Sequence, residues 1–467
     1  MKRPLKNLGS LLVSDAGSRV IGFLITAYLA RVLAPSAFGV LNIGLAVLGH
    51  LAILGSPGMQ IVETRNVAAK NSGLLERTGG VIALRFLFAL LLFALTWIVT
   101  GMAISSSSVR DVVRLYAASL IPYALLLDWY FQGKEDFVRL GVSRVLTYVV
   151  FGTVVLLLVR SANDLALAPV AFLLGNLFAA LFLGIAYVRN VGRPTLTWNP
   201  ALWRAILREN VPVGLALFLA QIVSNFPPLV VGYFLEERDV GMYSASLKLV
   251  FLLLIIDRLF GALFIPVITR YFSGLAEEVP FLLTVTLKVL LILLIPVTLC
   301  GIALSRSAVM LVFGEGYLEA APLLQIMMVF VLLTVLNTLF VSTLIGSGRE
   351  RLYSRAMMVG TGVLAVAVVV LTALFNTVGA AVALLVGEIS TLVLMIRGAR
   401  GVAVLPSIRV LVRPIVACAA MALTLWLLRS ADQMIACVIA LLVYGAFIVA
   451  SASLSKEEFQ YLRERFV

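Results

Sequence analysis

Fourteen hydrophobic segments, each about as long as a membrane-spanning helix, follow one another along this 467-residue chain. The apolar runs are continuous rather than alternating, which excludes an outer-membrane β-barrel. Hydrophobic residues make up 62% of the chain and charged residues only 13%, too few to cover a soluble protein of this length. The sequence therefore predicts an all-α polytopic membrane protein with about 14 transmembrane helices. The predicted segments are 8–33, 38–62, 80–104, 112–132, 141–160, 166–189, 211–235, 239–270, 279–304, 320–345, 355–375, 377–397, 410–429 and 434–454.

Lysine and arginine are distributed unevenly among the connections. Both termini and the connections after even-numbered segments hold 25 of the 36 basic residues, whereas the connections after odd-numbered segments hold 7. The other four, Arg19, Lys248, Arg258 and Lys288, are counted within the segments. By the positive-inside rule both termini are predicted to be cytoplasmic. The net charge of +13 then reflects topology rather than nucleic-acid binding, and the charges in the first segment argue against a cleaved signal peptide.

The connections are too short for a catalytic or nucleotide-binding domain. The longest covers residues 190–210, and no phosphate-binding loop of the form G-x-x-x-x-G-K-[ST] occurs. The single histidine, His50, and three cysteines in apolar runs predict neither a metal site nor a disulfide framework. We therefore expect a protein that is not an enzyme and has no resident cofactor, with H⁺ or Na⁺ as candidate counter-ions.

Two short motifs recur six segments apart. LAPSAFGVLN from Leu33 joins the first two segments, and LEERDVGMYS from Leu235 joins the seventh and eighth, 202 positions later. A second, similar pair of motifs is GKEDFVRLGVSR from Gly133 and GRERLYSR from Gly348, 215 positions apart. Because six is even, the repeats run in the same direction through the membrane, as in transporters with a site between two lobes. We predict a six-helix N-lobe (1–200) and a six-helix C-lobe (201–400) around a central cavity, with two further helices and a tail in 401–467.

Polar residues inside the first segment indicate a site. Asp15, Arg19, Gly22 and Thr26 recur with helical spacing and form one stripe on an otherwise apolar helix. A charge at the centre of the bilayer costs at least about 2.5–3.5 kcal/mol, so such a stripe is expected to face protein or water. The alternative is that Asp15 and Arg19 form an ion pair that only fixes helix packing.

Polar residues also occur in segments seven, eight, nine and twelve. The surplus of cations predicts a cavity that binds an anion, and guanidinium groups match phosphate oxygens in geometry. The predicted substrate-binding residues are Arg19, Arg258, Lys248, Asn225 and Lys288, and the candidates for ion pairing or ion coupling are Asp15, Asp257 and Glu388. Three alternatives stay open: a packing pair for Asp257 and Arg258, a packing role for Glu388, and snorkelling of Lys288 to the interface.

Several motifs together resemble those of a known family. They are an Arg-x-x-Gly in the first segment (Arg19–Gly22), an Ala-Arg-x-Leu-x-Pro-x-x-Phe-Gly turn (Ala30–Gly39), a segment with two glycines (Gly55–Gly58) and a basic run (Arg65–Lys70). The stretch VVGYFLEERDVGMYSASLKLV is similar to the family's second turn. The family is that of the bacterial polysaccharide exporters, the O-antigen-type flippases of the multidrug/oligosaccharidyl-lipid/polysaccharide (MOP) exporter superfamily.

The resemblance implies two six-helix lobes around a central cavity and a function in polysaccharide biosynthesis. The cargo of such a flippase is an undecaprenyl-pyrophosphate-linked oligosaccharide, as in lipopolysaccharide O-antigen synthesis. It moves from the cytoplasmic to the periplasmic leaflet of the bacterial inner membrane, with polysaccharide polymerase machinery as a candidate partner. The resemblance also implies that Arg19 and Arg258, in the first and eighth segments, act on the substrate. One departure is Pro227–Pro228, where relatives often carry an acidic residue followed by a basic one.

Other functions are compatible with the same layout. A peptidoglycan-precursor flippase, a teichoic-type lipid flippase and a cation-coupled multidrug exporter differ in cargo, and the surplus of arginine disfavours cationic drugs. A membrane polysaccharide polymerase or glycosyltransferase is the alternative from another class, which we expect to carry a large outward loop or an acidic motif. The acidic cluster of the outward connections, Glu236–Asp239, lies in a tight turn, a poor place for a catalytic carboxylate pair.

Overall fold

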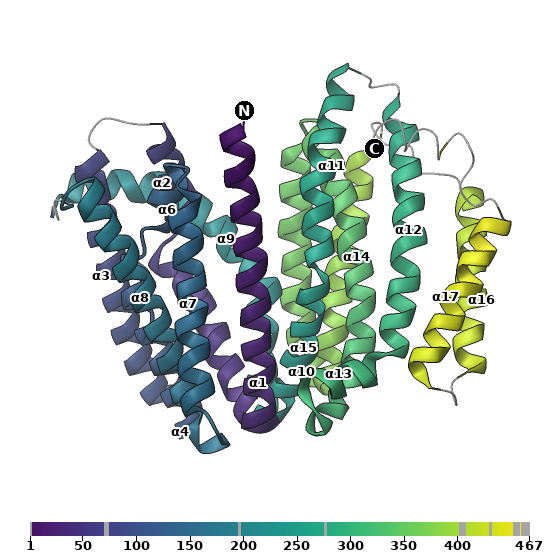
Figure 1. Ribbon diagram of the computed structural model, residues 1–467, viewed down its shortest axis with the longest axis horizontal. Helices are drawn as coiled ribbons and strands as arrows, with labels where there is room; N and C mark the ends of the chain where they lie inside the picture. Colours follow the sequence, from purple (N-terminus) through teal and green to yellow (C-terminus); the bar gives the residue numbers. More distant parts are fainter. Residues whose placement is uncertain are drawn as a thin grey trace. The chain divides into compact units, whose positions relative to one another are not determined.

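The computed structural model describes residues 2–69, 74–194, 198–274, 278–400, 408–428, 432–451 and 458. Side chains are described from Gly17 onward, except at 74, 408–412 and 414. These ranges are helical and contain no strand (Figure 1). Within them, eleven helices are long and apolar enough to cross a membrane. The predicted all-α polytopic membrane fold is therefore confirmed.

The helices follow one another with short connections. The first part of the chain holds α1 (Lys2–Gly55), α2 (Met59–Ala68), α3 (Leu74–Ala103), α4 (Ser107–Ala118), α5 (Leu120–Leu125), α6 (Asp128–Gly133), α7 (Phe137–Leu158), η1 (Ala162–Asp164), α8 (Leu167–Asn190) and α9 (Pro200–Phe234). The second part holds α10 (Glu237–Leu253), α11 (Ile255–Gly274), α12 (Val279–Ala303), α13 (Ser305–Phe313), η3 (Glu315–Ala320), α14 (Ala321–Gly346), α15 (Glu350–Ala399), α16 (Ile408–Leu427) and α17 (Gln433–Ala450).

Two long helices each hold two predicted segments. In α1 the break lies at Ala34 (φ 62°, ψ 169°), directly before Pro35, which has no backbone N–H to continue the helix. In α15 the break lies at Phe375 and Asn376 (φ 54°, ψ −142°), where the predicted eleventh segment ends and the twelfth begins. With these two breaks, each of the fourteen predicted segments corresponds to described helix.

The chain divides into two compact units, unit 1 (Met1–Ser244) and unit 2 (Ala245–Val467). The division falls inside α10, after the turn that begins the second sequence repeat. The lobe boundaries predicted at residues 200 and 400 were placed from the sequence repeat, whereas the two units are defined by compactness. The predicted boundaries therefore stay a prediction.

Unit 1 has two buried apolar clusters. One lies among α1, α4, α7 and α8 and includes Leu33, Tyr116 and Val155. The other lies among α2, α3, α6, α8 and α9 and includes Trp129 and Tyr187.

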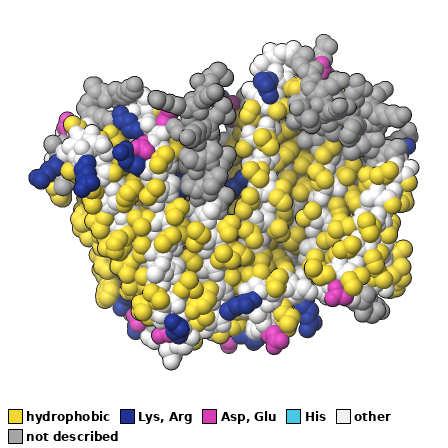
Figure 2. Space-filling view, viewed as in Figure 1, with side chains coloured by type: hydrophobic (Ala, Val, Ile, Leu, Met, Phe, Trp, Pro, Cys, Tyr) yellow, Lys and Arg dark blue, Asp and Glu magenta, His cyan; other side chains and the backbone are white. Residues whose placement is uncertain are grey.

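Figure 2 shows hydrophobic side chains over the middle of the visible face and charged side chains near the helix ends. That pattern is typical of a surface in contact with lipid, with its ends in water.

Unit 2 is built around α14, which packs along α11, α12 and α15. Its apolar core includes Phe264 from α11, Leu283 from α12 and Leu339 from α14. The C-terminal pair α16 and α17 packs on α12, where the Tyr444 hydroxyl donates a hydrogen bond of 2.9 Å to the Ile292 carbonyl oxygen. That bond fixes the depth at which α17 lies along α12.

The two repeated turns meet each other within unit 1. A Cβ atom placed on Gly39 would lie 1.7 Å from the Glu237 carbonyl oxygen, and one on Gly241 would lie 2.1 Å from the Pro35 carbonyl oxygen. Gly39 and Gly241 are 202 positions apart, as are Pro35 and Glu237. The contact is therefore reciprocal, the relation that a two-fold axis produces between equivalent surfaces, and glycine at both positions allows the two backbones to approach this closely.

Candidate functional site

A cavity of about 450 Å³ lies inside unit 1. Helices α1, α2, α3, α5, α6, α7, α8 and α9 all contribute to its wall, and its apolar part consists mainly of leucine, alanine and isoleucine side chains. Its polar side chains are those of Ser56, Gln60, Arg85, Ser119, Tyr123, Asp128, Arg144 and Gln221. The wall therefore combines apolar and polar side chains, and the volume is within the range of small-molecule sites.

Arg85 is held where the fourth predicted segment breaks. Helix α5 ends at Leu125 and α6 begins at Asp128, so carbonyl groups near the break do not accept the regular helical hydrogen bond from the N–H four residues further on. The Arg85 side chain enters from α3 and donates hydrogen bonds to the carbonyl oxygens of Leu126 (2.9 Å) and Tyr123 (2.8 Å). In a membrane such carbonyl groups must find a partner in the protein, and Arg85, 2% exposed, provides it.

Asp128 lies between two positive charges. Its carboxylate interacts electrostatically with both Arg85 and Arg144, and its Oδ1 also accepts a hydrogen bond of 3.2 Å from the Trp129 backbone N–H. The wall of the cavity thus carries two arginines and one aspartate. A broken membrane helix beside charged side chains is the arrangement in which transporters bind polar or ionic substrates.

The predicted substrate contact Asn225 lies next to this cavity. Gly49 on α1 faces α9, and a Cβ atom there would lie 2.4 Å from Asn225 Nδ2 and 3.3 Å from Gln221 Nε2. Gln221 lines the cavity, and Asn225 follows it by one helical turn on α9. A binding role for Asn225 stays a prediction, and the structure places it within one turn of the polar wall.

The stripe on α1 is only partly described. The Asp15 side chain lies outside the described residues, so its predicted pairing is untested. Arg19 is exposed. Further along the stripe, the Thr26 hydroxyl donates a hydrogen bond to the Gly22 carbonyl oxygen (2.8 Å), and Gly22 packs against the Tyr148 ring of α7.

The two carboxylates predicted as coupling residues in unit 2 are both held by α14. The Thr338 hydroxyl donates a hydrogen bond of 2.6 Å to Asp257 Oδ1, and Asn337 donates to the Glu388 carboxylate on α15. Adjacent residues of one helix thus position both acids. Arg258 is exposed on α11 and Lys248 is half-buried on α10. The roles predicted for these residues stay predictions.

Lys288 has a carboxylate partner that the sequence did not indicate. Its ammonium group lies 2.8 Å and 3.0 Å from the two carboxylate oxygens of Glu458, beyond α17. Both residues are at most 9% exposed, so the pair replaces solvent for both charges. Substrate binding by Lys288 stays a prediction.

Arg85 and Arg144 were not among the predicted site residues, and the count of basic residues included them with the connections. The structure places both inside membrane-length helices, α3 and α7, on the wall of the cavity. The available signal was their position: each lies within a predicted segment, 80–104 or 141–160.

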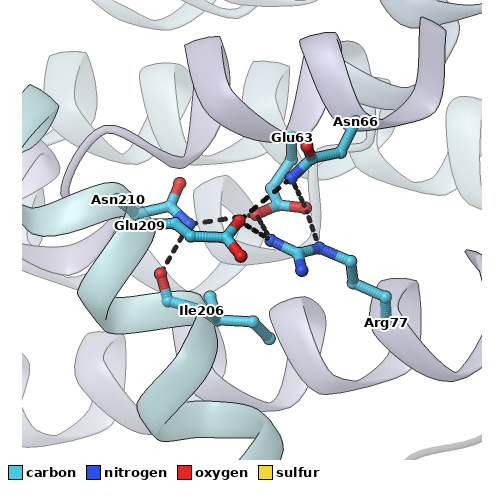
Figure 3. Close-up of polar contacts among 6 residues, drawn as sticks. All are labelled: Glu63, Asn66, Arg77, Ile206, Glu209 and Asn210. Atoms are coloured by element: carbon cyan, nitrogen blue, oxygen red, sulfur yellow. Dashed lines mark hydrogen bonds and ion pairs between the residues drawn. The ribbon is translucent and has the colours of Figure 1, made fainter. Parts of the chain in front are cut away.

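A second polar cluster joins α2, α3 and α9 (Figure 3). Arg77 donates two hydrogen bonds of 2.8 Å to the Glu63 carboxylate and one of 2.6 Å to Glu209. Asn210 Nδ2 donates to Glu63 at 3.0 Å, and Asn66 lies 3.4 Å from both carboxylates. Glu63 is only 1% exposed, so its charge depends on these donors. This cluster ties the first half of α9 to the rest of unit 1.

Comparison with known proteins identifies relatives over most of the chain. The family model for polysaccharide biosynthesis proteins matches residues 5–272. An Escherichia coli K12 protein named "Putative O-antigen transporter" is 21% identical over 411 residues, which cover 84% of this chain and 95% of that protein.

Solved structures of transporters share the fold. A lipid II flippase, MurJ, in an inward closed conformation superposes with a TM-score of 0.79 at 14% identity, covering 95% of this chain and 98% of that one. An inward-facing multidrug resistance MATE family transporter of the MOP superfamily superposes with a TM-score of 0.64 at 15% identity, covering 82% and 93%. These structures show that the chain has the fold of MOP-superfamily transporters, and its eleven membrane-length apolar helices agree with a multi-pass membrane protein. Because the family model covers more than half of the sequence, the chain belongs to the family of polysaccharide biosynthesis proteins.

Proposed function

We propose that this protein is a flippase that moves an undecaprenyl-pyrophosphate-linked oligosaccharide from the cytoplasmic to the periplasmic leaflet by alternating access. Family membership and the O-antigen transporter relative support a role in exporting a glycan precursor. The fold shared with a lipid II flippase is suited to a cargo whose polar head crosses while its tail stays in lipid.

The observation that carries the proposal is the charged cavity of unit 1. It lies within the region matched by the family model and is enclosed by membrane-length helices. Buried charges in a membrane protein are costly and are retained chiefly where they act on a substrate or ion. A polar cavity gives sugars and phosphates a hydrated environment within the bilayer, which hydrocarbon does not offer.

The direction of transport follows from charge. A membrane potential that is negative inside favours outward movement of an anion by about 2.3 kcal/mol per charge per 100 mV. Counter-transport of H⁺ or Na⁺ adds to this driving force, and Asp257 and Glu388, positioned by α14, are the candidate carboxylates for it.

A lipid II-type precursor is the second candidate cargo, because the MurJ structure superposes over 95% of this chain. The two candidates differ in their glycan and share the pyrophosphate-linked lipid. Rescue of a strain depleted of its lipid II flippase, set beside rescue of a strain lacking its O-antigen flippase, separates them. We expect the chain to rescue the second strain.

Replacing Arg19 or Arg258 by alanine is expected to reduce surface polysaccharide at least about tenfold, because each loses a charge-assisted contact to the pyrophosphate. Polysaccharide is measured on cells that carry equal amounts of membrane-inserted protein. Lysine at either position is expected to restore only part of the signal, because an ammonium group lacks the planar fork of guanidinium.

Matched controls are alanine at Arg160 in unit 1 and at Arg351 in unit 2, two other exposed arginines. Both controls are expected to display polysaccharide as the unmodified protein does. Normal display by both Arg19→Ala and Arg258→Ala contradicts the predicted contacts of these arginines with the substrate.

A further inference from the structure

The cavity of unit 1 has the lining of a saccharide site. Amide and hydroxyl groups of Gln60, Gln221 and Tyr123 supply both donors and acceptors, as sugar hydroxyls require. Phe172 and Leu217 supply apolar surface beside them, against which the C–H face of a sugar ring can pack. A polyprenyl chain is a poor occupant, because it offers no polar group to the amide, hydroxyl and charged groups of the wall.

Two buried polar atoms at this cavity have no hydrogen-bond partner among the described residues. They are Ser119 Oγ and Arg85 Nε, and both side chains line the cavity and are at most 2% exposed. A buried donor without a partner costs about 1–3 kcal/mol, a cost that a polar occupant able to reach either atom would remove. Ser119 lies one turn before Tyr123, which places its hydroxyl beside the other polar groups of the wall.

The charge of the cavity selects among polar occupants. Arg85 and Arg144 against Asp128 leave one net positive charge. A neutral sugar leaves that charge without a counter-ion. Pyrophosphate carries several negative charges and meets Asp128 as a like charge, which opposes its binding. A single carboxylate balances the cavity and offers two acceptor oxygens to a guanidinium fork.

We propose that the cavity of unit 1 binds a sugar unit of the cargo that bears one carboxylate group, as a uronic acid does. This inference rests on the proposed function and assigns the glycan, rather than the pyrophosphate, to this cavity, whose lining does not include Arg19. Arg144 binds the carboxylate, Asp128 accepts hydrogen bonds from the sugar hydroxyls, and Arg85 mainly holds the broken helix and contributes its charge.

Saturation-transfer NMR on the full chain in nanodiscs tests the ligand class with four probes: glucuronate, glucose, glucose 1-phosphate and inorganic pyrophosphate. Glucuronate is expected to bind about tenfold or more tightly than glucose, the value of one charge-assisted hydrogen bond, and more tightly than the two phosphate probes. Equal binding of glucuronate and glucose, or strongest binding of either phosphate probe, overturns the proposal.

Three variants test the residues. Arg144→Ala is expected to reduce glucuronate affinity to that of glucose, whereas Arg144→Lys keeps a preference for glucuronate because it keeps the charge. Asp128→Asn adds one unit of net positive charge, and we expect it to bind pyrophosphate measurably. Arg110→Ala, on α4 outside the cavity wall, is the control and is expected to change nothing. Unchanged glucuronate binding by Arg144→Ala overturns the assignment.

The inference can still be tested if the alanine variant does not fold, and a second assay separates its failure from failure of the proposed function. If Arg144→Ala is not monodisperse after purification, the four probes on the unmodified protein and the Arg144→Lys variant decide the question. Translocation of a lipid-linked glycan in vesicles is measured in parallel. Translocation without glucuronate binding contradicts only this inference, whereas an absence of translocation with any cargo contradicts the proposed function itself.

Discussion

Replacing Arg77 by alanine is expected to lower the free energy of unfolding by about 3–5 kcal/mol, because it leaves the buried carboxylate of Glu63 without its cation. Glu63 is 1% exposed and receives two of the three Arg77 hydrogen bonds at 2.8 Å. The measurement is unfolding of the purified protein in mixed micelles with increasing sodium dodecyl sulfate. We expect α9 to detach first, because Glu209 and Asn210 hold it to the same cluster.

Two further variants serve as controls for the predicted effect of Arg77→Ala. Arg139→Ala removes an ion pair to Asp136 whose side chains are 42% and 25% exposed, and it is expected to cost less than about 1 kcal/mol. The double variant Glu63→Gln with Arg77→Met is expected to recover most of the loss, because an amide accepts the Asn210 hydrogen bond without needing a cation. An Arg77→Ala protein as stable as Arg139→Ala contradicts the account of the cluster.

Alanine at Gly39 or Gly241 is expected to destabilise the protein by about 1–3 kcal/mol or more, the cost of overpacking a close contact. The added carbon meets backbone oxygen at 1.7 Å or 2.1 Å, and backbone cannot move aside as the end of a flexible side chain can. Because the contact is reciprocal, the two single variants are expected to lose similar stability. The double variant should cost less than their sum, since both substitutions open the same contact.

Gly184 on α8 provides the comparison, because no atom lies within 4 Å of a Cβ placed there. Alanine at that position is expected to be neutral or to stabilise the helix by up to about 1 kcal/mol. The measurement is the thermal unfolding of the unmodified protein, the three single variants and the double variant in one detergent. Gly39→Ala and Gly241→Ala proteins with the melting temperature of Gly184→Ala exclude the close contact between the repeated turns.

Span positions could be predicted because each span is an apolar run long enough to be read without any tertiary information. Both breaks inside long helices were also predictable. Pro35 ends the first half of α1 by its chemistry, and the fall in hydropathy around Asn376 marked the break in α15. The repeated turn was visible as a motif, whereas the contact between Gly39 and Gly241 depends on a tertiary approach that no local pattern encodes.

The candidate site was predicted less well, for physical reasons. Arg85 binds carbonyl groups exposed by a helix break about 40 residues further along the chain. Pro122 precedes that break by four residues, but no local pattern indicates which side chain binds the exposed carbonyl groups. Glu63 and Asn210 are 147 positions apart. For a basic residue near the end of a span, the sequence does not distinguish a side chain that extends to the membrane interface from one that is buried in the protein, because the same residue type at the same depth can do either.

The most direct test of the central claim is translocation in proteoliposomes. The purified protein is reconstituted with a fluorescent undecaprenyl-pyrophosphate-linked oligosaccharide, and the label that an enzyme added outside can reach is followed over time. The account predicts that label from the inner leaflet becomes accessible faster than in protein-free vesicles, and that the Arg19→Ala/Arg258→Ala double variant removes most of the acceleration. Equal rates in vesicles with and without the unmodified protein, under an imposed membrane potential and ion gradients, would contradict it.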